Sequence, residues 1–307
     1  MKAAIITPGR GVSEILDHLN RLDPQFKPEV WPDVRNPEDI SVALIWKTSD
    51  EILSKFPNLR LICSFGAGVD HLISKSSIPK SASITRLVDP KLSDSVSKYC
   101  IMSIIAYEKN FKNHILNKER KKWFWKDDIP QPAVGILGMG VIGNNLALKL
   151  NDLDYPINGY SLSPKISKFI SHYTGSENLS DFLKASDVLI NLMPLTSETH
   201  SFYDLEFFKQ CKTGTYFINV GRGQHVVDKD LLEAIDKGFL SGATLDVFNE
   251  EPLPAEHPFW NSDHLTMTPH IAGLTAPKSA ATQFYENYIR LRDGKSLLNQ
   301  VDTAREY

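Results

Sequence analysis

The sequence lacks paired cysteines and an excess of positive charge. Its 307 residues include only three cysteines, Cys63, Cys100 and Cys211, and no CxxC pair. Such sparse cysteines suit a reducing compartment and predict neither a disulfide framework nor a metal site. The 34 Lys and Arg residues and 37 Asp and Glu residues give a net charge of −3. This balance argues against nucleic acid or an anionic membrane surface as a partner.

Long apolar runs are also missing. The start of the chain, "MKAAIITPGRG", has a short apolar run that ends at Pro8 and Gly9, much shorter than the core of a signal peptide. No window approaches the ~18 apolar residues that a membrane-spanning helix needs. We therefore expect a cytoplasmic protein without a membrane partner. With 42% hydrophobic and 23% charged residues, a chain of this length is typical of a globular protein with two domains.

Short apolar runs alternate with amphipathic segments, a pattern that predicts parallel α/β folding. Buried strands are expected at "KAAIIT", "VALIW" and "LRLICSFG", with helices between them. One long helix is expected over 92–117, capped by Ser93 or Asp94. A second series then predicts a six-stranded doubly wound sheet, and a last helix is expected over 276–294.

A glycine-rich segment, "GILGMGVIGNNLALKL", opens the second series. Gly138, Gly140 and Gly143 have the G-x-G-x-x-G spacing, after an apolar strand and before a helical pattern. In that context the glycines permit a tight turn, close approach of backbone amides to a pyrophosphate, and tight helix–strand packing. The alternative is a structural glycine turn, and the context favours dinucleotide binding.

We therefore predict two doubly wound parallel-sheet domains of the α/β class. A Rossmann dinucleotide-binding domain, residues 98–276, is inserted in a flavodoxin-like substrate domain made of residues 1–97 and 277–307.

An acidic residue is missing where dinucleotide-binding proteins usually carry one. The second strand of this series ends in "INGYSLSPK", and Ser161 occupies the position that faces the adenosine ribose. An Asp or Glu there accepts from the 2′-hydroxyl of NAD(H) and repels a 2′-phosphate. Ser161, Ser163 and Lys165 suit a phosphate better, which favours NADP(H). The alternative for Lys165 is an exposed loop lysine.

Three polar residues follow later strands of the same series. Arg222 comes after "TYFINVG" and Glu251 after "SGATLDVF", and "LTMTPHIAG" places His270 at the end of the last strand. The carboxyl ends of parallel strands form the edge at which such sheets bind ligands. There an Arg can hold a carboxylate, and a His oriented by a Glu can exchange a hydroxyl proton. Alone, each residue could be a surface charge or a structural histidine, but their shared placement favours catalysis.

These motifs resemble the D-2-hydroxyacid dehydrogenase family, and in particular its glyoxylate/hydroxypyruvate reductase branch. The resemblance covers nearly the whole chain through "LIWK", "FGAGVDHL", "GILGMGVIG", "NVGRG", "TLDVFNEEPLP", "TPHIAG" and "QVDTAREY". It implies Arg222 as substrate anchor, Glu251 as partner of His270, and His270 as general acid/base. It also implies that Asp246 lies near the nicotinamide carboxamide.

The implied site has a substrate part and a cofactor part. Backbone amides around residues 67–69 would hold the substrate carboxylate, a use of flexible backbone as an anion nest. The predicted substrate contacts are Trp46, Ala67, Gly68, Val69 and Arg222. Trp46 could equally be a core residue. The predicted cofactor contacts are Gly138, Gly140, Val141, Ile142, Gly143, Ser161, Ser163, Lys165, Met193, Pro194, Val220, Gly221, Asp246 and Gly273.

One departure bears on the cofactor. Family members that use NADPH commonly show "SRS" at the ribose position, whereas this chain has Ser161, Leu162 and Ser163. The missing arginine removes the strongest phosphate ligand. NADP(H) is expected to be preferred, and NAD(H) stays possible.

The resulting hypothesis is NAD(P)H-dependent reduction of small 2-oxoacids, glyoxylate and hydroxypyruvate, to D-2-hydroxyacids in a cleft between domains. The alternatives are a reductase for a bulkier 2-oxoacid, phosphoglycerate oxidation as a less favoured reaction, and a non-catalytic NAD(P)H-sensing binding protein on the same fold. Trp123, Phe124 and Trp125 cannot all face one core. Either this segment packs across a domain seam or it meets a second subunit, and the resemblance implies a homodimer with contacts through the dinucleotide domain.

Overall fold

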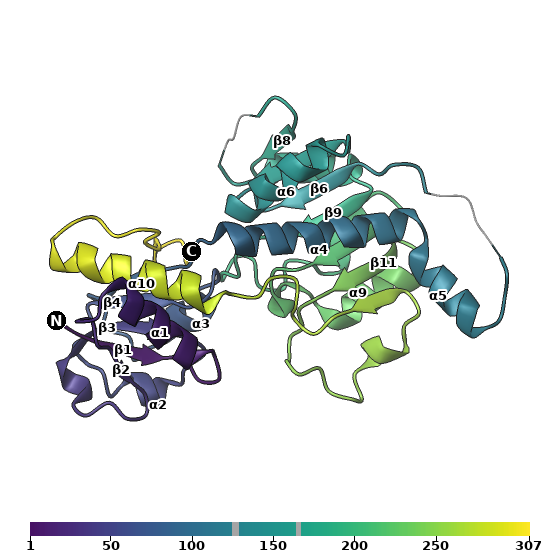
Figure 1. The fold of residues 1–307 in the computed structure, drawn as a ribbon. Helices are drawn as coiled ribbons and strands as arrows, with labels where there is room; N and C mark the ends of the chain where they lie inside the picture. Colours follow the sequence, from purple (N-terminus) through teal and green to yellow (C-terminus); the bar gives the residue numbers. More distant parts are fainter. Residues whose placement is uncertain (125–128, 164–166) are drawn as a thin grey trace. The chain divides into compact units, whose positions relative to one another are not determined.

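The computed structural model describes residues 1–124, 129–163 and 167–307 and divides into two compact units. Unit 1 comprises residues 1–92 and 275–307, and unit 2 comprises residues 93–274. Each unit is built on its own sheet of parallel strands with helices around it (Figure 1). The predicted fold class is therefore confirmed. The division into a substrate domain and a dinucleotide-binding domain with boundaries at 97/98 and 276/277 stays a prediction.

Unit 1 holds a sheet of strand order β2-β1-β3-β4-β5, the order of flavodoxin-like folds. Strands β1, β3 and β4 are buried almost throughout, as expected for apolar strands covered on both faces. The elements are β1 (Lys2–Ile6), α1 (Val12–Leu22), β2 (Glu29–Val30), η1 (Pro37–Asp39), β3 (Ile40–Ile45), α2 (Asp50–Leu53), β4 (Leu61–Ser64), α3 (Asp70–Ile73), β5 (Ser83–Thr85) and α10 (Pro277–Arg292).

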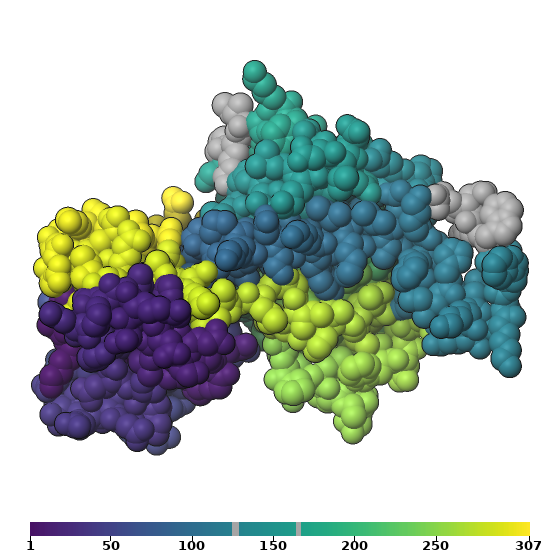
Figure 2. Space-filling view, in the orientation of Figure 1, coloured from purple at the N-terminus to yellow at the C-terminus, as the bar shows by residue number. Residues whose placement is uncertain are grey.

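Helix α10 packs against α1 and so ties the end of the chain to its beginning. The two helices share a 2.8 Å hydrogen bond between His18 and Thr282. Phe26 stacks obliquely on Tyr288, with ring centroids 4.5 Å apart. Figure 2 shows the yellow C-terminal helix lying directly on the purple N-terminal part of this unit.

Unit 2 holds a sheet of order β12-β11-β10-β9-β6-β7-β8, a doubly wound arrangement with its switch point between β6 and β9. Helices α4 and α6 pack with β6 and β9 in one apolar cluster, while α7, α8 and α9 form another. The elements are α4 (Pro90–Glu108), α5 (Phe111–Glu119), β6 (Val134–Leu137), α6 (Val141–Asn151), β7 (Ile157–Ser161), β8 (Ser171–Thr174), η2 (Ser176–Asn178), α7 (Leu179–Lys184), β9 (Val188–Asn191), α8 (Leu205–Gln210), β10 (Thr215–Asn219), η3 (Gly223–His225), α9 (Asp228–Asp236), β11 (Leu240–Leu245), η4 (Pro258–Asn261) and β12 (Leu265–Met267).

Three expectations about elements are wrong. Within the described residues this sheet has seven strands rather than six, because the edge strand β8, "SHYT", is polar and carries no apolar run. The helix expected over 92–117 is two helices, α4 and α5, since Asn110 takes a left-handed φ of 49° between them. Helix α4 begins at Pro90, ahead of Ser93 and Asp94, and the Asp89 side chain accepts from the Lys91 amide at 2.9 Å.

Among the helices in the described ranges, none combines the length and apolar character that crossing a bilayer demands.

Candidate active site

The glycine loop joins β6 to α6 at the switch point of unit 2. Gly138 has φ +104°, and an added Cβ would lie 2.6 Å from the backbone carbon of Leu192. A Cβ at Gly143 would lie 2.2 Å from the carbonyl oxygen of Gly138. The chain itself therefore requires glycine at both positions, for the turn and for close packing.

Gly140 differs, because an added Cβ there would meet no protein atom within 4 Å. It is the N-cap of α6, and no side chain caps that helix end. The amides of Val141, Ile142 and Gly143 begin a helix of 11 residues whose N-terminus favours an anion. Open space beside uncapped amides fits a dinucleotide pyrophosphate, which these residues would hold.

The predicted ribose position lies at the end of β7. Ser161 donates its hydroxyl proton to the carbonyl of Ser163 at 2.7 Å, which shapes the loop that leaves the strand. Leu162 between them is 65% exposed and offers no polar group. Lys165, the predicted phosphate cation, lies outside the described residues. The structure thus places two serines at the strand end, and neither side chain brings a carboxylate to the ribose position.

His270 and Glu251 form a direct pair. Nδ1 of His270 lies 2.9 Å from Oε2 and 3.1 Å from Oε1 of Glu251. Oε1 of Glu251 also accepts from the Phe248 amide at 3.2 Å, which fixes the carboxylate. The His270 side chain is 36% exposed. A ring held at Nδ1 presents Nε2 for proton exchange with a bound oxygen.

Asp246 holds the loop that carries His270. Its buried carboxylate accepts from the Thr268 hydroxyl at 2.6 Å and from the amides of Ile271 and Ala272, both at 2.8 Å. The Asp246 carbonyl accepts from the His270 amide at 2.8 Å. These bonds support a left-handed φ of 55° at His270, a conformation uncommon outside glycine. The carboxylate thus has a role within the protein, and its contact with the cofactor stays a prediction.

Arg222 follows β10, next to β11 in the sheet. Its Nη1 donates to the carbonyl of Gly221 at 2.8 Å. A Cβ on Gly223 would lie 1.8 Å from the backbone carbon of Phe248, so this loop sits directly on the loop that leads to Glu251. The structure therefore joins the loops of Arg222 and Glu251, and pairs Glu251 with His270.

The other predicted cofactor positions line the same sheet edge. Met193 and Pro194 follow β9, Val220 and Gly221 follow β10, and Gly273 follows the His270 loop. Each is at least partly exposed. Sequence reasoning missed three buried neighbours of these loops, Asn191, Asn219 and His225. The available signal was a polar residue ending each of two apolar strands.

The predicted substrate contacts of unit 1 gather at the carboxyl ends of β3 and β4. Trp46 is partly buried, and a Cβ on Gly66 would lie 2.5 Å from its ring, so loop and ring pack together. The Arg10 guanidinium lies 5.4 Å from the centre of the Trp46 ring. Ala67 and Gly68 are partly exposed and Val69 is buried. The structure brings these positions together, and their contact with substrate stays a prediction.

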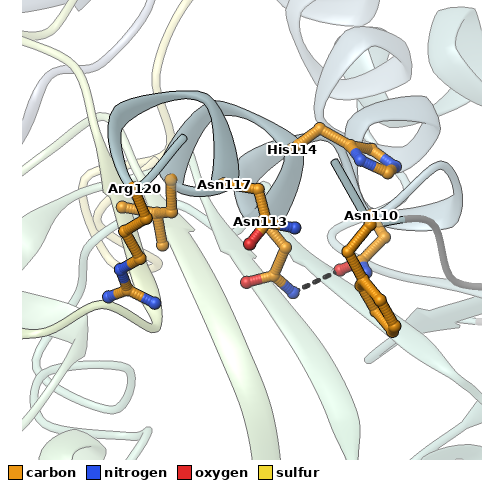
Figure 3. A pocket seen from close by; sticks show the side chains of 7 residues that line it. Asn110, Asn113, His114, Asn117 and Arg120 are labelled. Carbon is orange, nitrogen blue, oxygen red and sulfur yellow. Dashed lines mark hydrogen bonds between the residues drawn. The ribbon is translucent and has the colours of Figure 1, made fainter. Parts of the chain in front are cut away.

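A separate hollow on α5 does not carry this chemistry (Figure 3). The residues around it are Asn110, Asn113, His114, Leu116, Asn117, Arg120 and Phe124. In this group Asn113 bonds to Asn110, and no carboxylate is present to orient the histidine. The hollow therefore lacks the paired acid and base found after β11 and β12.

Comparison with known proteins decides the family. The family model described as D-isomer specific 2-hydroxyacid dehydrogenase, NAD binding domain, matches residues 99–272. A glyoxylate/hydroxypyruvate reductase A from Serratia proteamaculans is 33% identical over 98% of both chains. This chain belongs to the D-isomer specific 2-hydroxyacid dehydrogenase family. The resemblance expected from the motifs is confirmed, and the protein is an NAD(P)-dependent oxidoreductase.

Solved structures of the family share the whole fold. A 2-hydroxyacid dehydrogenase from Xanthobacter autotrophicus, in complex with NADPH and MES, has a TM-score of 0.93 at 31% identity, covering 100% of this chain and 99% of its own. An NADPH-dependent glyoxylate/hydroxypyruvate reductase from Sinorhizobium meliloti, in complex with NADP and sulfate, has a TM-score of 0.92 at 27% identity, again covering 100% and 99%.

Proposed function

We propose that this family member reduces small 2-oxoacids, glyoxylate and hydroxypyruvate among them, to D-2-hydroxyacids with NADPH as the preferred donor. The observation that carries the proposal is the 2.9 Å contact between Nδ1 of His270 and Oε2 of Glu251. The loop of Arg222 packs against the loop that leads to Glu251. A carboxylate anchor, an oriented proton donor and a dinucleotide loop are the three parts that this reduction needs.

Each residue has a defined part in the proposed reaction. The bound cofactor supplies the hydride that reaches the carbonyl carbon of the substrate. His270 gives a proton from Nε2 to the carbonyl oxygen, while Glu251 holds Nδ1. Arg222 binds the carboxylate and so fixes which face of the carbonyl is presented. Hydride plus proton convert the oxoacid to the hydroxyacid, and water restores the proton on His270.

The preference for NADPH rests on two observations. Ser161 and Ser163 bring no carboxylate to the ribose position, so nothing in these two side chains repels a 2′-phosphate. The Xanthobacter and Sinorhizobium relatives have structures with NADPH or NADP. Because the chain lacks the arginine of the "SRS" pattern, we also propose that it uses NADH to some extent.

The deciding assay follows absorbance at 340 nm with purified protein. Glyoxylate and hydroxypyruvate are each tested with NADPH and with NADH, at equal concentrations. We expect oxidation of both cofactors and a higher kcat/KM with NADPH. A higher kcat/KM with NADH would contradict the cofactor preference. Loss of neither cofactor would contradict the proposed substrates and direct attention to bulkier 2-oxoacids.

The proposal includes a homodimer formed through unit 2. Helix α5 exposes Phe111 and Ile115, and Trp123 and Phe124 follow it with exposed rings. Large apolar side chains grouped on one short segment favour contact with a second protein surface. A second copy of this chain is the proposed partner.

A further inference from the structure

Three buried polar side chains form a network behind the loops of the candidate site. Asn191 ends β9, Asn219 ends β10, and His225 ends the short helix η3. All three are at most 1% exposed. Buried polar groups must find partners, so the pattern of their hydrogen bonds reports what they hold in place.

Backbone groups fix the direction of this network. The Met193 amide can only donate, and it reaches Oδ1 of Asn191 at 3.0 Å. Nδ2 is therefore the donor of Asn191, and it lies 2.9 Å from both Oδ1 of Asn219 and Nδ1 of His225. Nδ1 of His225 accepts this bond, and the Arg222 carbonyl also lies 3.1 Å from the same nitrogen.

The remaining bonds tie this ring to Arg222. The Arg222 amide donates to the same Nδ1 at 3.1 Å, while Nε2 lies 3.2 Å from the Pro194 carbonyl and donates to it. The Arg222 carbonyl accepts from Nδ2 of Asn219 at 2.9 Å. Both backbone polar groups of Arg222 are thus bonded by the network, and Nε2 of the His225 ring also contacts the loop after β9.

We propose that His225 is a positioning residue for substrate, which sets the backbone of Arg222 against the loop of Met193 and Pro194. This inference rests on the proposed function, since it assigns a support to the proposed carboxylate anchor. Nδ1 of the buried His225 is the acceptor that the Arg222 amide and the Asn191 side chain share. Without it, both groups lose a hydrogen bond away from solvent. The Arg222 loop must then shift to satisfy them, and small displacements of a binding group cost much of the rate.

Two substitutions separate positioning from bulk packing. His225→Leu removes the acceptor, and we expect the KM for glyoxylate or hydroxypyruvate to rise about tenfold or more. The NADPH dissociation constant, read from protein fluorescence, should change by less than about twofold. His225→Asn places an amide oxygen close to the position of Nδ1 and should restore most of the KM. Equal loss in both variants, or a KM that does not move in His225→Leu, would overturn the proposal.

Tyr203→Phe is the matched control. Tyr203 packs against His225 with ring centroids 6.2 Å apart, and its buried hydroxyl has no hydrogen-bond partner among the described residues. Its removal alters buried polarity beside the network without touching the network. The KM of this variant should equal that of the wild type, and a rise like that of His225→Leu would mean that the effect is general packing.

A double-mutant cycle tests whether His225 acts through Arg222. In an Arg222→Lys background the carboxylate anchor is already impaired. Adding His225→Leu to that background should therefore raise the KM for the oxoacid by less than about twofold. Losses that simply multiply would show that His225 acts elsewhere and would overturn the assignment.

Hydrogen exchange keeps this inference separable from the proposed function. If the wild type reduces neither oxoacid, the proposed function fails, yet exchange over 219–226 can still be compared. We expect faster exchange in His225→Leu than in the wild type, with protection regained in His225→Asn. Unchanged protection in His225→Leu would overturn the positioning role whatever the substrate.

Discussion

At the scale of single residues, the catalytic proposal depends on His270 more than on its neighbours. Sequence position alone placed Arg222, Glu251 and His270 after successive strands, and the structure adds the 2.9 Å contact of His270 with Glu251. What the sequence could not indicate is the support behind them. Asp246 and His225 act through buried bonds to backbone groups, and such bonds depend on loop conformations that no periodicity encodes.

His270→Ala should reduce kcat by about 10²–10⁴-fold, the usual contribution of a general acid. The NADPH dissociation constant should stay within about twofold, because the ring is held by Glu251 rather than by the glycine loop. His264→Ala is the control. That exposed histidine lies just before β12, at the opposite end of the strand from His270. Stopped-flow and steady-state kinetics at 340 nm supply kcat, and cofactor affinity lost in step with kcat would contradict the role of His270.

At the scale of elements, apolar runs located the buried strands well, whereas polar edges and short strands escaped. Strand β8 has no apolar run, and β2 has only two residues, so neither produced a pattern. The break at Asn110 escaped because apolar residues continue past it into α5. Edge strands and helix breaks depend on tertiary packing, which leaves no pattern in the sequence. Central strands are buried on both faces, and this burial appears in the sequence as apolar runs.

The glycine loop offers an element-scale prediction that separates fold from binding. Gly140→Ala puts a methyl group into open space, so Tm should fall by no more than about 4 °C, as for loss of a glycine N-cap. NADPH affinity should nevertheless fall at least about tenfold, because that space is the proposed pyrophosphate site. Gly143→Ala, with a methyl 2.2 Å from the Gly138 carbonyl, should lower Tm more. Thermal melts and fluorescence titrations measure both. Unimpaired NADPH binding in Gly140→Ala would place the pyrophosphate elsewhere.

At the scale of the whole molecule, the chain leaves unit 1 at the start of α4 and returns to it before α10. The sequence predicts a discontinuous first domain, because two α/β series differ in their motifs and two helices bracket the second. The sequence does not show which surface covers the apolar segment around α5. Exposure of a side chain depends on the finished fold, so the sequence could only note that adjacent aromatics do not share one core.

The homodimer proposal predicts a specific loss of association. Wild-type protein should sediment at twice the mass of one chain. The double substitution Phe111→Glu and Ile115→Glu replaces two apolar side chains that are 56% and 47% exposed with charged ones. Because both positions are exposed in the single chain, each chain should stay folded while the dimer dissociates. Leu22→Glu, on α1 of unit 1 and 43% exposed, is the matched control and should remain dimeric.

Sedimentation velocity over a range of concentrations decides the outcome. A wild type that sediments as one chain would contradict the homodimer, and a dimer that survives both glutamates would place the interface on another face of unit 2, since burying two unpaired carboxylates in an interface is too costly for association to persist.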